Sequence, residues 1–402
     1  MPRLFRSLRH RNYRLYFFGQ ILSLHGTWMQ NVAQAWLVYR LTESSFMLGL
    51  VSFLGMAPVL LLGLFGGLVA DRLPRRRLFL GAQALAMLQA LVLAGLTLTD
   101  VIRVEHVMLL ATLLGFVHAF EMPARHTLVA ELVPRQDLHN AIGLNSSTFN
   151  LARTLGPVTA GWLIGWLGEG GVFLLNALSY LAVIVALLVM RLTDSPPGGG
   201  SRGRGIVEGL RFAWHERALR MTLLLVGVVS LFANPYLVLM PVFAREVFGG
   251  GAEQLGLLVG AAGAGALAGA LHLALRHKAA GLTRLIALAG LLLGLGLLLF
   301  SRITLFPLAL TVLLLVGFSL TSVAAASNTF LQLSIPDALR GRVMALFSVI
   351  FIGFTPLGNL LAGALAERLG VQAAVLLMGA VVLLGAALFA YGCHRARVRR
   401  AS

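Results

Sequence analysis

The stretch GLVADRLPRRR, residues 67–77, decides how this chain folds, because it places one Asp and four Arg directly after a long apolar run. The carboxyl end of a helix carries partial negative charge on its free carbonyl groups. Arginines suit such an end, whereas Asp71 needs a positive partner there. The stretch therefore predicts a charged loop between two apolar helices, with Asp71 paired to a cation.

The composition predicts an all-α membrane protein. Of the 402 residues, 58% are hydrophobic and 12% are charged, and the mean hydropathy is +0.87. A soluble domain cannot hide so much apolar surface, and a bilayer core needs about 20 apolar residues per helical span. Twelve transmembrane helices are predicted, at residues 15–39, 46–70, 78–98, 106–130, 141–167, 171–190, 221–244, 255–275, 285–301, 305–333, 343–366 and 371–391. Weak boundaries at 98–106 and 301–305 leave thirteen or eleven spans as alternatives.

The net charge of +17 is explained by topology. If both termini are cytoplasmic and the spans alternate, 26 of the 32 Lys and Arg fall in cytoplasmic segments. This asymmetry follows the positive-inside rule, by which basic loops stay in the cytoplasm. We therefore expect a multi-pass protein of the inner or plasma membrane with both termini inside. Its surroundings are the lipid bilayer, and we expect no nucleic-acid partner.

The second half of the chain matches the first at an offset of 202 residues. Eight identities share this frame without a gap: Gly67/Gly269, Gly115/Gly317, Phe116/Phe318, Thr127/Thr329, Pro134/Pro336, Gly156/Gly358, Gly161/Gly363 and Gly168/Gly370. Nearer the N-terminus the register drifts, and Leu48-Gly49 resembles Leu255-Gly256 at an offset of 207. Such an offset preserves the direction of every helix, so it predicts two parallel six-helix repeats. We assign residues 1–191 to the first bundle, 192–216 to a polar cytoplasmic linker and 217–402 to the second bundle.

Four charged residues of the first repeat have uncharged counterparts in the second. The pairs at the 202 offset are Asp71/Leu273, Glu121/Val323, Arg125/Ser327 and Arg153/Thr355. Because the second repeat builds the same scaffold without these charges, the scaffold does not need them. They are therefore the first candidates for function.

Two such repeats around residues 67–77 resemble the major facilitator superfamily. Five residues match its signature between the second and third helices, roughly G-x-x-x-D-R-x-G-R-[RK]: Gly67, Asp71, Arg72, Arg75 and Arg76. Pro74 stands where the family usually has Gly. Residues 120–168 are similar to the exporter branch that includes macrolide and siderophore efflux proteins. Within them GPVTAG, with Gly156, Pro157 and Gly161, resembles the fifth-helix motif of drug:proton antiporters.

The resemblance implies a transporter whose two halves rock against each other. It implies a latch in which Asp71 faces the start of the eleventh helix, where Arg340 and Arg342 lie. Gly67, lacking a side chain, would let the second helix approach closely. The alternative is that Asp71 neutralises a neighbouring arginine in its own loop.

A charged face on the fourth predicted helix suggests proton coupling. His118, Glu121 and Arg125 share this face, and Glu121 with Arg125 is a favourable i,i+4 pair. An antiporter needs a group that exchanges a proton, and we assign this role first to Glu121 and second to His118, because imidazole titrates near neutral pH. A purely local ion pair is the alternative for Glu121.

Polar residues on other predicted helices suggest a substrate cavity. The first helix carries a polar stripe at Gln20, Ser23, Thr27, Asn31 and Gln34. Arg153 lies deep in its span, where a charge is costly unless it faces a cavity or a partner. The resemblance implies cavity candidates at Trp28, Asn31, Asn150, Arg153, Asn234, Tyr236 and Ser322. Interhelical hydrogen bonding could equally explain the stripe, and a structural strut could explain Arg153.

We therefore expect a secondary active transporter that exports amphipathic or hydrophobic small molecules, with proton antiport as the driving force. An importer or facilitator on the same fold is one alternative. A membrane sensor or assembly partner that does not transport is another. The sequence has no phosphate-binding loop and no metal-ligand cluster, so we expect no enzyme activity, no cofactor and no metal. We expect a monomer whose partners are a small-molecule substrate and protons.

Overall fold

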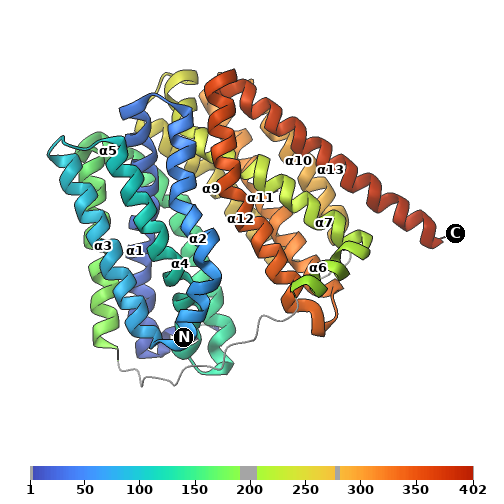
Figure 1. The fold of residues 1–402 in the computed structure, drawn as a ribbon, viewed down its shortest axis with the longest axis horizontal. Coiled ribbons are helices and arrows are strands. Elements are labelled where there is room, and N and C mark those ends of the chain that lie inside the picture. The colour runs from blue at the N-terminus through green and yellow to red at the C-terminus, as the bar shows by residue number, and fades with distance from the viewer. Residues whose placement is uncertain (1–2, 191–205, 277–280, 402) are drawn as a thin grey trace. The chain divides into compact units, whose positions relative to one another are not determined.

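The structure is a computed structural model that describes residues 3–190, 206–276 and 281–401 (Figure 1). Most of the predicted linker, 192–216, lies outside these residues. The described segments are helical and contain no strand. The first elements are η1 (Arg3–Arg9), α1 (Arg11–Thr42), α2 (Ser45–Arg72), α3 (Arg75–Leu98), α4 (Val104–Glu131) and α5 (Arg135–Val189). They are followed by α6 (Ile206–His215), α7 (Arg217–Val228), η2 (Val229–Ala233), η3 (Asn234–Leu239), α8 (Met240–Val242), η4 (Phe243–Val247), α9 (Ala252–Ala274), α10 (Leu282–Phe300), α11 (Phe306–Ser334), α12 (Asp337–Leu369) and α13 (Val371–Ala401).

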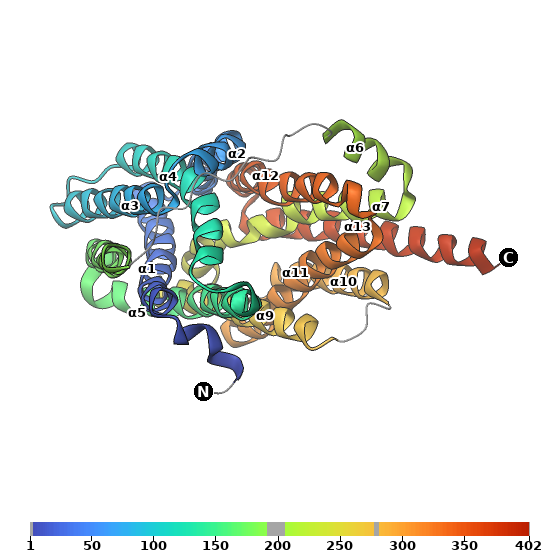
Figure 2. The same cartoon turned by 90° about the horizontal axis from the view of Figure 1, so that it is seen from below.

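The chain forms two compact units, and each unit includes one short segment from the other half of the sequence. The first unit consists of Met1–Glu43, Val51–Ser201 and Gly251–Gly260, so it includes the first turns of α9. The second consists of Ser44–Leu50, Arg202–Gly250 and Ala261–Ser402, so it includes the first turns of α2. Within the first unit α1 packs mainly on α5, and α3 packs on α4 and α5 (Figures 1 and 2). Within the second, α10 packs on α11 and α13.

Ten helical segments among the described residues are long and apolar enough to cross a membrane. The chain is therefore a multi-pass membrane protein. One of the ten is α5, with 55 residues, whereas the sequence predicts two spans there. The helix α1 is not among the ten, because its polar stripe lowers its hydropathy.

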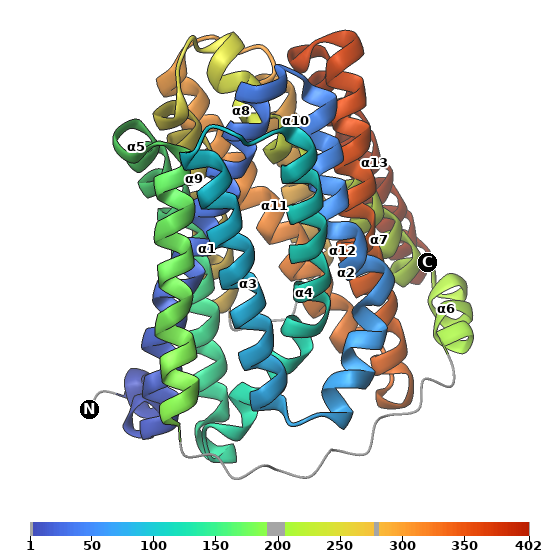
Figure 3. The same cartoon turned by 60° about the vertical axis from the view of Figure 1, so that its left-hand side comes forward.

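The helix α5 consists of two arms that meet at Gly168, whose backbone is not helical (φ 66°, ψ 175°). On the first arm, the carbonyl of Ala141 accepts a hydrogen bond from Tyr13, and Thr159 contacts His25, so this arm runs parallel to α1. After Gly168 the chain turns back along α1, as Figure 3 shows. Glycine adopts this left-handed conformation without steric cost.

Equivalent glycines of the two halves make equivalent contacts. In the first unit, a Cβ on Gly161 would lie 2.5 Å from the carbonyl oxygen of Ala252 and 3.0 Å from the Cα of Gly256. In the second unit, a Cβ on Gly363 would lie 2.6 Å from the carbonyl oxygen of Ser45 and 3.1 Å from the Cα of Gly49. Gly161 and Gly363 are related by the 202 offset, and Gly49 and Gly256 by the 207 offset. Such small residues let helix backbones approach closely in membranes.

The segment that follows α7 departs from regular α-helix. Residues 229–247 pass through π and 3-10 turns before the chain reaches α9. Pro235 and Pro241 lie in this segment, and each lacks the N–H that an α-helix needs. The predicted span 221–244 is therefore helical throughout but irregular in its second half.

Candidate functional site

Two arginines at the start of α3, directly after the loop from α2, are held within the first unit. Arg75, at the start of α3, forms an ion pair with Glu131 at the end of α4. Arg76 donates hydrogen bonds to the carbonyl oxygens of Leu187 (2.8 Å) and Leu188 (3.1 Å). These carbonyls belong to the last turn of α5, where a helix lacks internal donors and carries partial negative charge. The loop is thus tied to both α4 and α5.

The predicted latch falls partly outside the described residues. The side chain of Asp71 is not described, so its partner stays a prediction. Arg340 donates from Nε to the carbonyl of Gln332 (3.0 Å), and its Nη2 lies 2.5 Å from a carboxylate oxygen of Asp337. Both contacts are local to the junction of α11 and α12. Arg72 is exposed and Arg342 is half-buried.

Two neighbouring glycines of α2 have different surroundings in the first unit. A Cβ on Gly67 would meet no atom within 4 Å. A Cβ on Gly66 would overlap the carbonyl group of Ala119 on α4. Gly66 therefore allows tight packing of α2 on α4, and the approach to the eleventh helix expected at Gly67 stays a prediction.

The charged face of α4 holds a buried acid. Glu121 is 7% exposed, and Nε of Arg125 lies 3.6 Å from its Oε1. The local pair expected from the i,i+4 spacing is therefore present. His118, one turn earlier, is half-buried on the same face. The structure thus groups both proton-coupling candidates on one face of α4.

Glu131 is a charged residue that our sequence reasoning missed. It lies in the last turn of α4, where a carboxylate is unfavourable beside free carbonyl groups. The same argument that gives Asp71 a positive partner applies to Glu131, and that partner is Arg75. The position of an acid at a helix end was the signal that could have found it.

The face of α5 that carries the antiporter-like motif contacts α1. A Cβ on Gly156 would lie 2.6 Å from the Cβ of Trp28. The rings of Trp28 and Phe149 meet edge to face, with centroids 5.8 Å apart. Arg153 lies one turn from both Phe149 and Gly156, so its Cα is on this side of α5. Trp28 and Arg153 are both half-buried.

The motif also packs α5 against the first turns of α9. The carbonyl oxygen of Pro157 would lie 2.5 Å from a Cβ on Gly256. Gly161 contacts the same turn, as described above. The motif thus contacts two helices: Gly156 packs against α1, and Pro157 and Gly161 pack against α9.

Some polar side chains of α1 form hydrogen bonds with side chains of other helices. The amide of Gln30 donates to Gln89 (3.1 Å) and accepts from Asn176 (2.7 Å). Thr27 lies within 3.3 Å of the Tyr180 hydroxyl. Asn31, by contrast, is exposed. The polar residues of α1 therefore combine interhelical hydrogen bonding with accessible polar groups.

The second unit has a hydrogen-bonded cluster at the position equivalent to Arg153. Asn234 donates to the hydroxyl of Thr355 (3.1 Å), which also lies 3.0 Å from the hydroxyl of Ser230. Thr355 is the 202-offset counterpart of Arg153. Of the other cavity candidates in this unit, Tyr236 and Ser322 are each 1% exposed. Neither of these two side chains is accessible to solvent in this structure.

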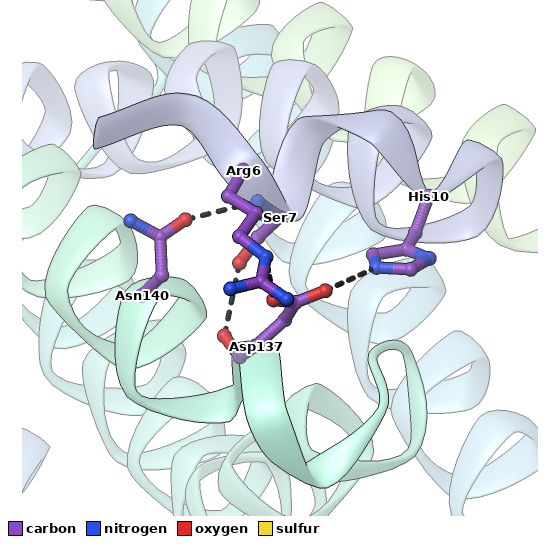
Figure 4. Close-up of polar contacts among 5 residues, drawn as sticks. All are labelled: Arg6, Ser7, His10, Asp137 and Asn140. Atoms are coloured by element: carbon purple, nitrogen blue, oxygen red, sulfur yellow. Dashed lines mark hydrogen bonds and ion pairs between the residues drawn. The ribbon is translucent and has the colours of Figure 1, made fainter. Parts of the chain in front are cut away.

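A polar cluster at the N-terminus was not predicted (Figure 4). Nε of Arg6 lies 2.6 Å from Oδ1 of Asp137, and Nε2 of His10 lies 2.8 Å from Oδ2. Ser7 donates from its hydroxyl to the Asp137 carbonyl (3.0 Å) and from its backbone to Asn140 (2.9 Å). Asp137 is buried in the first turn of α5, whose positive end suits a carboxylate. The cluster fixes η1 to the start of α5.

These observations define the class of the protein. Apolar helices long enough to span a bilayer enclose a small number of charged and hydrogen-bonded residues, and no group of metal-ligating residues is found in the part of the chain that the structure describes. This is the construction of a membrane transporter. The family model for transmembrane secretion effectors matches residues 4–401, so the chain belongs to this family of the major facilitator superfamily.

Individual relatives agree with this assignment. The chain is 30% identical over 386 residues to the multidrug efflux pump Tap of Mycolicibacterium fortuitum, covering 92% of this chain and 93% of that pump. It is 26% identical over 373 residues to the staphyloferrin A transporter of Staphylococcus aureus, with coverage of 91% and 92%. It is 24% identical over 393 residues to macrolide efflux protein A of Streptococcus pyogenes, with coverage of 93% and 95%.

A solved structure shares the fold. It is a bacterial homologue of the human lysosomal transporter Spinster in an inward-facing, unoccupied conformation, with a TM-score of 0.75 at 14% identity. The match covers 95% of this chain and 97% of that one. Together, the family and its relatives confirm the resemblance to major facilitator exporters that the sequence motifs indicate.

Proposed function

We propose that this transporter exports amphipathic or hydrophobic small molecules by alternating access, in exchange for protons. The observation that carries the proposal is the packing of α5, which contacts α1 at Gly156 and the first turns of α9 at Gly161. Alternating access needs helix contacts that close one side of a cavity and can separate. Contacts between small residues close tightly without interlocking long side chains. The names of the relatives, two of them efflux proteins, support the direction of transport.

The proposed architecture is twelve transmembrane helices in two parallel six-helix repeats, with both termini in the cytoplasm. The break of α5 at Gly168 supports two spans within that helix. The matching contacts of Gly161 with Gly256 and of Gly363 with Gly49 support a duplicated unit. In this topology the Gly161 contact lies at the outer end of the helices.

The proposed conformational latch joins Asp71 to Arg340 or Arg342. Gly67, Arg72, Arg75 and Arg76 complete this gating motif. The ion pair of Arg75 with Glu131 and the bonds of Arg76 to α5 support a loop that moves with α3, α4 and α5 as one body. The position of Asp71 would then change together with these three helices, so its pairing would depend on the conformation of the transporter.

The proposed proton site is Glu121, with His118 as the second candidate. Glu121 is buried beside Arg125 at 3.6 Å, which is longer than a tight hydrogen bond. A carboxylate held this loosely can bind a proton when Arg125 moves away. We therefore place coupling on the face of α4.

The proposed substrate contacts are Trp28, Asn31, Asn150, Arg153 and Asn234, together with Tyr236 and Ser322 in a conformation that exposes them. Trp28 and Phe149 supply aromatic surface beside Arg153. This combination suits an amphipathic compound with a polar group.

Transport of a compound panel in everted membrane vesicles tests the proposal. Vesicles with the chain and vesicles without it are energised to acidify their interior, and a pH-sensitive dye reports the gradient. We expect ethidium or a macrolide to dissipate the gradient only when the chain is present. An importer or facilitator would move the compound without consuming the gradient, and a sensor would bind it without flux. Either result would contradict proton-coupled export.

A further inference from the structure

A pocket of about 480 Å³ lies in the first unit between α1, the first arm of α5 and the start of α9. Three of the five tryptophans of the chain line it: Trp36 from α1, and Trp162 and Trp166 from α5. The ring centroids of Trp162 and Trp166 are 5.3 Å apart, and these side chains are 57% and 76% exposed. The volume is within the range of small-molecule sites.

The charge of this pocket is negative. Glu253, at the start of α9, is the one charged residue among those that line it, and it is exposed. Arg40 lies one turn beyond Trp36 on α1, but its Nε is 2.8 Å from a carboxylate oxygen of Glu169. The nearest basic residue along α1 is therefore already paired. Aromatic faces together with an exposed carboxylate attract a cation.

The equivalent place in the second unit is built differently. At the 202 offset, Trp162 corresponds to Ala364, and Gly165 corresponds to Glu367. The carboxylate of Glu367 accepts hydrogen bonds from the hydroxyl of Ser44 and the backbone N–H of Phe46, both 3.1 Å, so it caps the start of α2. A Cβ on Gly165 would meet nothing within 4 Å, so the first unit leaves this space open.

The start of α9 is capped by a residue of α9 itself, whereas the start of α2 is capped by Glu367 from a distant helix. The side chain of Gln254 accepts a hydrogen bond from the backbone of Gly251 at 2.8 Å. The scaffold therefore needs neither the tryptophans nor Glu253 to hold this helix end. Their presence requires another explanation.

We propose that this pocket binds a small organic ammonium ion. The faces of Trp36, Trp162 and Trp166 receive the alkylated ammonium group through cation–π contacts, and Glu253 supplies the opposing charge. A soluble compound fits better than a zwitterionic lipid headgroup, because the phosphate of such a lipid would meet Glu253 and no basic residue among those that line the pocket. This site is separate from the proposed substrate contacts, and its occupancy does not depend on export.

Equilibrium binding to the purified full chain in a neutral, lipid-free detergent tests the proposal. The probes are benzyltrimethylammonium and its uncharged carbon analogue neopentylbenzene. We expect the cation to bind and the analogue to bind at least about fivefold more weakly. Trp162→Ala, which installs the residue of the second repeat, should weaken cation binding about three- to tenfold. Glu253→Gln should have an effect of similar size and tests the site independently of any effect of Trp162→Ala on folding.

Trp214→Ala is the matched control, because Trp214 is a similarly exposed tryptophan on α6, outside the pocket. It should leave binding unchanged. Equal affinities for wild type, Trp162→Ala and Glu253→Gln would overturn the proposal and leave the tryptophans as membrane-interface anchors.

A comparison in lipid identifies the source of the ammonium group. The same measurement is made in nanodiscs of phosphatidylglycerol and of phosphatidylcholine. Equal affinity in both supports a soluble ligand. Binding that is present in phosphatidylglycerol and lost in phosphatidylcholine would show that the lipid headgroup occupies the pocket, and would overturn the assignment to a soluble compound.

Discussion

Gly161 on α5 and Gly256 on α9 pack so closely that a Cβ on either residue would lie 3.0 Å from the Cα of the other. Gly161→Ala should therefore force the helices apart, at a cost of about 1–3 kcal/mol for overpacking. We expect a lower thermal unfolding midpoint and slower efflux from the same preparation.

Gly165→Ala is the control for this change, because it lies one turn further along α5 and its Cβ would meet nothing within 4 Å. It should leave both the unfolding midpoint and efflux near wild type. If the two variants behave alike, the contact of Gly161 with Gly256 is not needed for transport.

The ion pair of Arg75 with Glu131 should stabilise the first unit. Each side chain is 23% exposed, so the pair is partly shielded from water, and we expect a coupling energy of about 1 kcal/mol. A double-mutant cycle with Arg75→Gln and Glu131→Gln, followed by thermal unfolding, measures it. Arg72→Gln, on the same loop and exposed, should have little effect. Additive losses in the cycle would mean that the two residues do not interact.

Asp71→Asn should leave the protein inserted in the membrane but reduce transport at least about tenfold, equivalent to ~1.4 kcal/mol. The reason is the loss of a charge that, in the proposed latch, pairs with Arg342. Exchanging the two charges, with Asp71→Arg and Arg342→Asp together, should restore part of the activity. Wild-type flux in Asp71→Asn would remove the latch from the account.

Arg153→Lys should change substrate preference more than protein yield, because lysine keeps the charge but lacks the planar guanidinium that binds polar groups in a fixed geometry. Ratios of transport rates for a neutral and an anionic compound measure the preference. Arg103→Lys, an exposed arginine at the start of α4, is the control. Reduced yield with an unchanged ratio would assign Arg153 to a structural role.

Glu121→Gln should abolish proton-driven accumulation while preserving downhill exchange, because glutamine keeps the shape of the side chain but cannot release a proton. Both activities are measured in the same vesicles. Glu105→Gln, which neutralises an exposed acid at the other end of α4, should retain both. A full response of Glu121→Gln to an imposed pH gradient would move the assignment to His118, and His118→Gln is then the variant to measure.

The helices were predictable because each is a long apolar stretch of sequence bounded by charged residues. The span predicted at 46–70 lies within α2 (Ser45–Arg72), and the boundary predicted between 167 and 171 contains Gly168. The contact of Glu121 with Arg125 was predictable for the same reason, because a helix brings residues four apart onto one face.

Contacts between distant segments were harder to predict. Asp137 binds Arg6 and His10 across about 130 residues of sequence, and nothing in the spacing of a single chain indicates that meeting. The basic residues near the N-terminus were explained by topology alone. Here they also hold a buried carboxylate. The tight packing of Gly66 on α4 was likewise not predicted, because it depends on which neighbouring helix this face of α2 meets.

Reconstitution of the purified chain into proteoliposomes tests proton-coupled export most directly. An inward-directed or outward-directed pH gradient is imposed in the absence of any other protein, and ethidium accumulation is followed over time. We predict accumulation against the ethidium gradient when the compartment that receives ethidium is acidic, its loss when the gradient is collapsed, and a rise in the pH of that compartment as ethidium enters. Ethidium movement that only equalises its concentration, with no change in pH, would contradict the account.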